Sequence, residues 1–312
     1  MKVLITGAGG FLGRALTRLL IARGDAVIAF DTALGVLAAE FAEDERFVPC
    51  PGDITDMANV AQAMLTYRPV AVIHCAAIVG VASSLGSPTL VMRVNVEGSL
   101  NVMEAMRLAG TPRLLHISSE EVYGPFLADV IDETHPLDPI MPYGISKAAV
   151  ERLGRTYRAL HGIEVIHLRT SWVFGTELPR NRIPKNLLDA AIAGVPLHLS
   201  CGAQTAIDHT YIDDFACGAL QALDLPRHPY DVYNLSSGRS ATLTEIIGHI
   251  RELIPQADLS VGPGAYRFND QVEAVRKGAL DIGRARETFG FNPAFDIRAG
   301  LHAYIDAKRA RP

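Results

Sequence analysis

The sequence predicts an α/β protein: a doubly wound parallel sheet covered by helices on both faces, with a smaller, interleaved C-terminal domain. Three features lead to this prediction. Short apolar runs alternate with longer segments of helical periodicity, and several runs are apolar at every position, as in strands buried on both faces. A glycine-rich turn also joins the first run to the first helix. The 312 residues, 49% of them hydrophobic, suffice for a sizeable core.

Each element is predicted from its own pattern. Apolar runs of strand length predict strands at Val3–Thr6, Ala26–Phe30, Val70–His74, Arg113–Ile117, Glu164–Leu168 and Val232–Leu235. Apolar residues at helical spacing predict helices at about 11–23, 56–66, 89–109 and 143–161. Past Arg169, prolines punctuate shorter elements. We therefore expect a larger domain from 1–175 and 207–238, and a substrate-binding domain from 176–206 and 239–312.

Charge and cysteine usage argue against several functions. A net charge of −5 gives no electrostatic reason to expect nucleic acid or an anionic membrane surface as a partner. The stretch 69–92 lacks charged side chains, but serines, glycines and a proline interrupt it, which argues against a membrane span. Cys50, Cys75, Cys201 and Cys217 lie far apart, so neither disulfides nor a thiolate zinc site is expected. We expect a cytoplasmic protein without a metal ion.

The glycine-rich turn predicts a dinucleotide site. Gly7, Gly10 and Gly13 keep a G-x-x-G-x-x-G spacing, and glycine allows a tight turn and a close approach of a pyrophosphate to the backbone. The following helix supplies free N–H groups and a positive dipole end. Asp31 closes the second strand, where a carboxylate accepts hydrogen bonds from the adenosine ribose and repels a 2′-phosphate. NAD is therefore expected rather than NADP; the alternative is a turn beside a solvated aspartate.

Tyr143 and Lys147 are four residues apart, which places a phenol and an ammonium on one face of a helix. Tyrosine is a poor base at its usual pKa of about 10, but a neighbouring cation favours the phenolate. The pair can then move a hydroxyl proton while hydride leaves for a nicotinamide. The Y-x-x-x-K spacing also occurs by chance on exposed helices, but its position downstream of the glycine turn favours catalysis.

Polar residues follow the predicted strand Arg113–Ile117, at the sheet edge where ligands of open parallel sheets bind. Ser119 is expected to donate a hydrogen bond to the reacting oxygen. Glu121 is a candidate acid or base, and Glu120 is a candidate substrate contact. The alternative is that the serine caps a turn and that both glutamates are solvated.

Together these motifs resemble the extended short-chain dehydrogenase/reductases of the NAD-dependent epimerase/dehydratase family. The resemblance covers most of the chain and rests on TGAGGFLG at 6–13, HCAA at 74–77, VNVEGSLNV at 94–102, SSEEVYG at 118–124, YGISK at 143–147, YIDD at 211–214 and DIGRARETFGF at 281–291. It implies a Rossmann-type NAD-binding domain as the larger domain and a catalytic centre of Ser119, Tyr143 and Lys147. It also implies a homodimer formed through the helices at about 89–109 and 143–161.

Parts of the chain resemble different branches of this family. SSEEVYG resembles the loop of sugar-nucleotide 4,6-dehydratases and uronate decarboxylases, whereas LRTSWVFG at 168–175 resembles the 4-dehydrorhamnose reductases. Trp172 and Ile207 stand where relatives commonly have an Asn and an Arg near the substrate diphosphate. Ala82 replaces an Arg that is typical of uronate epimerases.

These departures predict a substrate smaller than a nucleotide-diphosphate sugar, because a buried diphosphate needs polar or cationic partners. Arg180 or Arg182 is then expected to meet a carboxylate of a sugar acid. In the alternative, these arginines, or Arg267, rebuild a diphosphate site from another direction.

The expected function is NAD-dependent hydride transfer at a secondary hydroxyl of a sugar or sugar derivative. Three alternatives stay open: net dehydrogenation of a free sugar or sugar acid, a nucleotide-sugar 4,6-dehydratase or decarboxylase that uses Glu121, and a catalytically silent NAD-binding sensor. The expected cofactor contacts are Gly7, Gly10, Phe11, Leu12, Gly13, Asp31, Asp53, Ile54, Ala76, Ala77, Asn95, Tyr143 and Lys147. The expected substrate contacts are Ser84, Ser119, Glu120, Trp172, Arg180 and Arg182. Asp53-Ile54 would hold the adenine edge, or else form an ordinary turn.

Overall fold

The larger part of the molecule is a seven-stranded parallel sheet with strand order β11-β7-β5-β4-β1-β2-β3. The computed structural model describes residues 1–268 and 272–310. The strands of this sheet are β1 (Lys2–Thr6), β2 (Ala26–Asp31), β3 (Phe47–Pro51), β4 (Ala71–His74), β5 (Arg113–Ser119), β7 (Glu164–Thr170) and β11 (Val232–Asn234). The predicted α/β class is confirmed, and the strand order reverses beside β1, as in a Rossmann fold.

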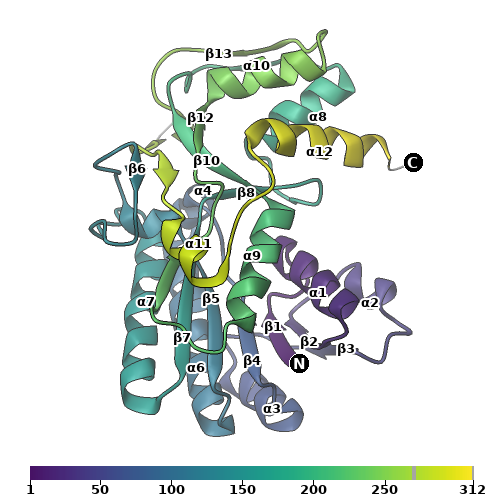
Figure 1. Cartoon of the computed structure of the whole chain (residues 1–312), viewed down its shortest axis with the longest axis vertical. Coiled ribbons are helices and arrows are strands. Elements are labelled where there is room, and N and C mark those ends of the chain that lie inside the picture. The colour runs from purple at the N-terminus through teal and green to yellow at the C-terminus, as the bar shows by residue number, and fades with distance from the viewer. Residues whose placement is uncertain (269–271, 311–312) are drawn as a thin grey trace.

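Helices cover both faces of this sheet, which explains the uniformly apolar strands. One face carries α1 (Phe11–Arg23) and α9 (Ile212–Asp224), and the other carries α3 (Met57–Tyr67), α6 (Gly98–Ala109) and α7 (Pro142–His161) (Figure 1). Successive side chains of a strand point to opposite faces. Ile5 accordingly lies in one core with Leu16, whereas Leu4 lies in a second core with Val60 and Val102.

The helix expected at 89–109 is divided into three helical segments. Short α5 (Pro88–Met92) runs into a π-helical turn, η1 (Arg93–Glu97), and then into α6. Asn95 lies in this π turn and binds the backbone of Ile78 twice, accepting from its N–H at 2.8 Å and donating to its carbonyl at 3.0 Å. The loop after β4 is therefore held by α5–α6. No helix of the described residues, 1–268 and 272–310, is long and apolar enough to cross a membrane.

A smaller part lies beyond the carboxyl edge of the sheet, at the top of Figure 1. Its helices α8 (Lys185–Ala193), α10 (Leu243–Leu253) and α12 (Ile297–Arg309) pack together, next to the parallel pair β9 (Leu197–Leu199) and β13 (Leu259–Val261). A mixed sheet of β12 (Ser240–Thr242), β10 (Ala206–Tyr211) and β8 (Trp172–Phe174) joins the two parts. Helix α11 (Gly283–Phe289) instead contacts β11. The domain division drawn from the sequence stays a prediction.

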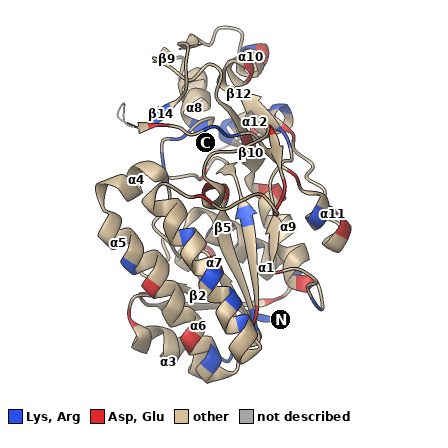
Figure 2. Cartoon of the chain, turned by 90° about the vertical axis from the view of Figure 1, so that its left-hand side faces the viewer, with Lys and Arg blue, Asp and Glu red and all other residues tan. Residues whose placement is uncertain are grey.

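Short elements bring distant segments to the same edge. They are α2 (Leu37–Glu40), α4 (Val81–Gly86), η2 (Glu120–Tyr123), β6 (Val130–Ile131), β14 (Arg267–Phe268), β15 (Val272–Glu273) and β16 (Ala279–Leu280). Strand β16 pairs with β6, which places the chain before 279 alongside the loop after β5. Figure 2 shows the face made by α7, α6 and α3, on which basic residues recur along α7 and acidic residues lie on the adjacent helices.

Candidate active site

A cavity of about 900 Å³ runs along the carboxyl edge of the large sheet, between the two parts of the molecule. Most residues singled out from the sequence line it. These are Gly7, Gly10, Phe11, Leu12, Gly13, Asp31, Asp53, Ile54, Ala76, Ala77, Ser119, Glu120, Glu121, Tyr143, Lys147, Trp172, Arg180 and Arg182. The structure therefore brings residues from many separate elements and loops to one space.

Two predicted contacts, Asn95 and Ser84, are not among the lining residues. Asn95 uses its amide on the Ile78 backbone and on the Ser146 hydroxyl, so it supports the loop after β4 from behind. Ser84 is fully buried and donates to the carbonyl of Val81, one turn earlier in α4. The prediction that these side chains contact ligand directly needs correction, because their polar atoms are used inside the protein.

In the turn between β1 and α1, main-chain atoms rather than side chains form the cavity wall. Gly7 has φ +70°, and a Cβ there would lie 2.6 Å from the backbone nitrogen of Ala76. A Cβ on Gly13 would lie 2.1 Å from the carbonyl oxygen of Gly7. Any side chain at these two positions would therefore push the turn away from β4 or from α1.

Asp31, at the end of β2, lies beside this turn. Its carboxylate accepts from the backbone N–H of Gly9 at 2.9 Å and from that of Ala33 at 3.1 Å. Oδ1 also accepts from the Thr32 hydroxyl at 3.3 Å, whereas Oδ2 keeps an acceptor position that a ribose hydroxyl can use. Asp53 is exposed and accepts from the N–H of Thr55 at 2.8 Å, whereas the adjacent Ile54 is buried. Asp53 and Ile54 thus form an ordinary turn and at the same time line the cavity.

Ser119 and Tyr143 meet on the wall opposite the glycine turn. The Ser119 oxygen accepts from the N–H of Glu121 at 3.2 Å, so the serine does cap η2, in agreement with the alternative drawn from the sequence. Its hydroxyl proton is still available. Burial raises the pKa of Tyr143, while the positive charge of Arg180 and a hydrogen bond with Ser119 oppose that rise. Both groups therefore favour the phenolate that proton transfer requires.

Lys147 lies one helical turn from Tyr143 and is almost fully buried. Its ammonium donates to the carbonyl of Ile117 at 2.6 Å and to Nε2 of His116 at 3.3 Å. Burial lowers the pKa of Lys147 to about 8. The ammonium is thus held in place by one carbonyl and one imidazole rather than by a carboxylate.

The imidazole of His116 is held in turn by His167. Their Nδ1 atoms are 3.0 Å apart, and since Nε2 of His116 accepts from Lys147, its Nδ1 carries the hydrogen and donates. Burial lowers the pKa of both imidazoles, that of His167 to about 4, which keeps them neutral. No group of three or more His, Cys, Asp or Glu within 1–268 and 272–310 is arranged to hold a metal ion.

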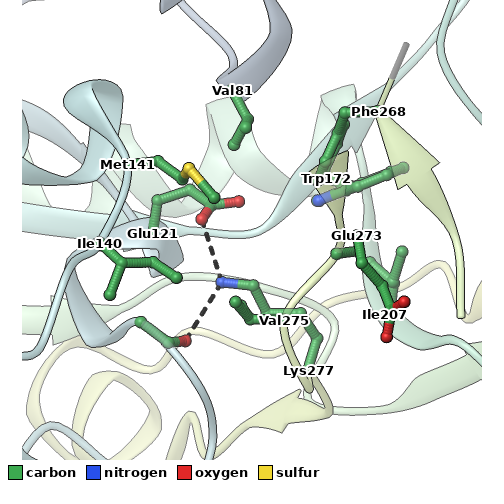
Figure 3. Close-up of a pocket in the computed structure, with 12 residues that line it drawn as sticks. Val81, Glu121, Ile140, Met141, Trp172, Ile207, Phe268, Glu273, Val275 and Lys277 are labelled. Carbon is green, nitrogen blue, oxygen red and sulfur yellow. Dashed lines mark hydrogen bonds and ion pairs between the residues drawn. The ribbon is translucent and has the colours of Figure 1, made fainter. Parts of the chain in front are cut away.

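The two glutamates after Ser119 are buried, which contradicts the solvated alternative. Glu121 forms an ion pair with Lys277 at 3.2 Å, seen as a dashed line in Figure 3. Glu120 accepts from the Ser171 hydroxyl at 2.8 Å. Burial raises the pKa of Glu120 to about 7, with the charge of Lys277 acting against this rise and that of Glu121 adding to it. One carboxyl is thus ion-paired and the other is poised near neutral pH.

Trp172 and two arginines close the far end of the cavity. The Arg182 guanidinium stacks on the Trp172 ring, 3.9 Å from its centroid. Arg180 donates to the carbonyl of Val79 at 2.5 Å. Figure 3 shows Trp172 and Glu121 on opposite sides of a smaller adjoining cavity, which Ile207 also lines. Arg267, the third candidate, is half exposed, lines neither cavity and faces Glu273 at 3.9 Å.

Sequence reasoning missed several residues of the site. Tyr266 and Phe268 line the large cavity, and Lys277 lines the adjoining one. Lys277 is 156 residues from its partner Glu121, so no local pattern could have connected them. His116 did leave a signal, because an imidazole in the middle of an otherwise apolar strand needs a buried partner.

Comparisons with known proteins agree with this geometry. A family model described as "NAD dependent epimerase/dehydratase family" matches residues 3–236. A dTDP-glucose 4,6-dehydratase of Neisseria meningitidis serogroup B is 29% identical over 98% of this chain and 94% of that protein. A solved UDP-glucose 4-epimerase of Thermotoga maritima with UDP-glucose is 25% identical, with a TM-score of 0.89 over 99% of both chains. The UDP-glucose 4-epimerase of Thermus thermophilus in complex with NAD is 26% identical, with a TM-score of 0.84 over 100% of both chains.

Proposed function

The chain belongs to the NAD-dependent epimerase/dehydratase family, and we propose that it oxidises a secondary hydroxyl of a carbohydrate and then completes a second proton transfer before the cofactor is reoxidised. NAD is its cofactor. The glycine turn fits a pyrophosphate, because the space at Gly7 and Gly13 would be filled by any Cβ. When bound, NAD supplies the hydride acceptor for the carbinol carbon.

The first step uses the three residues on the wall opposite the turn. We assign Tyr143 as the base that removes the hydroxyl proton, with Lys147 favouring its phenolate by charge. We assign Ser119 as a donor to the same oxygen, because its hydroxyl already hydrogen-bonds with the phenol of Tyr143. A purely NAD-binding sensor would have no use for this proton-transfer machinery.

The second step is supported by one observation above all: two adjacent buried carboxyls in different environments. Glu121 is ion-paired and is suited to remove a proton from the carbon next to the new ketone. Glu120, with a pKa raised to about 7 by burial, is suited to protonate a departing hydroxyl. Together they would expel water, and the hydride would then return to the product, so that no net NADH appears.

Glutamine substitutions test this division of roles. In Glu120→Gln and in Glu121→Gln, we expect oxidation to occur once and then stop, with a keto sugar and one equivalent of NADH bound per site. Rapid-quench mass analysis and absorbance at the NADH band measure both. The exposed Glu287→Gln is the matched control. Full multiple turnover in both site variants would refute the second step.

Net dehydrogenation of a free sugar or sugar acid is the second candidate. It is favoured by Trp172 and Ile207, because neither offers the cationic contact expected for a nucleotide diphosphate. Wild-type protein incubated with NAD would then release NADH in proportion to product. Product formed without NADH supports the first proposal.

We further propose a cytoplasmic homodimer formed through α6 and α7. Leu108 and Leu160 are exposed apolar residues on these helices, and Ile145 is partly so. All four cysteines are free thiols, which suits a reducing compartment. Sedimentation of the wild type and of Leu160→Asp tests the dimer: the variant should shift toward monomer, and an unchanged dimer would exclude this interface.

A further inference from the structure

The far end of the cavity holds two arginines together with Glu120, whose pKa burial raises to about 7. Arg180 and Arg182 both line it, and neither forms an ion pair with a carboxylate among residues 1–268 and 272–310. The nearby Glu121 is already paired with Lys277. Unpaired cations in a buried site are costly unless an anion joins them. The two guanidinium groups without an ion pair point to an anionic ligand at this end.

The loop after β4 holds the Arg180 guanidinium in place. Its Nη1 donates to the carbonyl of Val79, and Gly80 beneath it has φ +105°. A Cβ on Gly80 would lie 2.6 Å from Nη1, so a side chain at this position would displace the arginine. The loop after β4 thus holds the charge close to Tyr143, whose pKa it lowers.

Arg182 is held by a ring rather than by a hydrogen bond. The guanidinium carbon lies over the Trp172 ring, 3.9 Å from its centroid, and a contact of this kind leaves N–H groups free to donate. Burial lowers the pKa of Arg182 to about 10, so it stays charged at neutral pH. A stacked guanidinium is well suited to bind a carboxylate through two parallel hydrogen bonds.

Three buried polar atoms around this end have no hydrogen-bond partner in the described part of the chain: Nε1 of Trp172, Oγ1 of Thr170 and Oε1 of Glu120. Each residue is less than 9% exposed, and all three line the cavity. Figure 3 shows the indole nitrogen of Trp172 facing the smaller adjoining cavity, which Glu121 and Glu273 also line. Buried polar groups are seldom left unpaired, so these atoms indicate where a bound molecule supplies partners.

We propose that the substrate carries a carboxylate on the sugar itself, held by Arg182 and the Trp172 N–H with Arg180 nearby, and that it carries no nucleotide. A carboxylate accepts only, which matches donors of this kind. The diphosphate of a nucleotide sugar lies on the anomeric side, whereas these cations lie next to the phenol that meets the reacting hydroxyl, so they suit a carboxylate on the sugar better than a diphosphate. The inference rests on the oxidation step of the proposed function, but not on the second proton transfer.

Binding to the NAD-loaded Tyr143→Phe variant tests this inference without turnover. The probes are three matched pairs: glucuronate and glucose, galacturonate and galactose, gluconate and glucitol, each titrated calorimetrically. We expect at least one acid to bind roughly 10- to 100-fold more tightly than its neutral partner, and UDP to give no saturable signal. Equal binding within all three pairs would overturn the proposal, as would micromolar binding of UDP. Tighter binding of glucose 6-phosphate than of every acid would show that the site binds a phosphate group, and would refute the proposed carboxylate.

Two substitutions in the same background locate the carboxylate. Each of the substitutions Arg182→Gln and Trp172→Phe should lower the affinity for the preferred acid by roughly tenfold or more. The affinities for NAD and for the neutral sugar should stay unchanged, which shows that the fold is intact. Arg267→Gln is the matched control on an exposed arginine. Acid binding that survives both substitutions would place the carboxylate elsewhere and refute the assignment.

Failure of this inference can be told apart from failure of the proposed function. If free acids do not bind but wild-type protein converts UDP-sugars, the anion site is wrong and the carbohydrate oxidation stands. If an acid binds through Arg182 but wild-type protein never transfers hydride from any probe, the anion site stands and the proposed oxidation fails.

Discussion

The part of the cavity that we assign to NAD, the cofactor half, is built mainly from backbone, whereas the part that we assign to substrate, the substrate half, is built from side chains. In the cofactor half, the turn at 7–13 and the loop at 76–77 present main chain, and Asp31 and Asp53 contribute charge. The substrate half comprises Ser119–Glu121, Tyr143, Trp172, Arg180, Arg182 and Lys277. A backbone surface suits a ligand that stays the same, because substitutions at residues other than the glycines leave the main-chain groups in place. A side-chain surface can change its ligand by single substitutions.

The largest effect is expected from Tyr143→Phe, which breaks the substrate half and spares the cofactor half. Loss of the phenolic proton acceptor should reduce turnover by roughly 10²- to 10⁴-fold. The affinity for NAD, measured by fluorescence titration, should change little. Near-normal turnover would remove Tyr143 from the proton transfer.

Gly13→Ala should break the cofactor half. The added methyl would lie 2.1 Å from the Gly7 carbonyl, so the turn must move, at a cost of roughly 1–3 kcal/mol in stability and a parallel loss of NAD affinity. Gly248→Ala, in the interior of α10 with nothing near its Cβ, is the matched control and should stabilise by about 0.5–1 kcal/mol. Equal melting temperatures and NAD affinities for both variants would contradict the backbone description.

The raised pKa of Glu120 predicts a pH dependence in the substrate half. The folded chain holds this proton up to about pH 7, and the unfolded chain only to about 4.5, so stability falls as pH rises through that window. Glu120→Gln removes the penalty. Its stability relative to wild type should rise between these pH values by on the order of 2 kcal/mol, measured by urea unfolding. Parallel pH curves for the two proteins would show that Glu120 ionises normally.

A smaller effect is expected from changing the groups that hold the Lys147 ammonium, which lies where the two halves meet. His116→Leu removes one hydrogen-bond acceptor of the Lys147 ammonium and should lower the pKa of Lys147 further. The alkaline limb of the kcat/KM profile should then move to lower pH, and the activation free energy should rise by roughly 1 kcal/mol. His116→Gln keeps an acceptor and should restore both the limb and the rate. If Leu and Gln behave alike, His116 only fills space.

The two halves also differ in how well the sequence predicted them. The cofactor half could be predicted from the spacing of Gly7, Gly10 and Gly13, because a turn that requires glycine shows this requirement within a few residues of sequence. Asn95 was predicted to touch ligand, yet it binds the Ile78 backbone; sequence spacing alone does not say which way an amide points. The second role of Ser119, capping η2 while it lines the cavity, needed coordinates as well.

The sequence alone was enough for six of the seven strands of the large sheet and for the helices between them, since both depend on short-range periodicity and on turns that few residues can form; no residue range was predicted for β3 or α9. It was also enough for the Tyr143–Lys147 pair, because a helix places positions four apart on one face. Only the folded chain decided that Lys277 reaches Glu121 and that Arg182 stacks on Trp172. These contacts join segments far apart in sequence, and burial, which no local pattern reports, is what gives Glu120 its raised pKa.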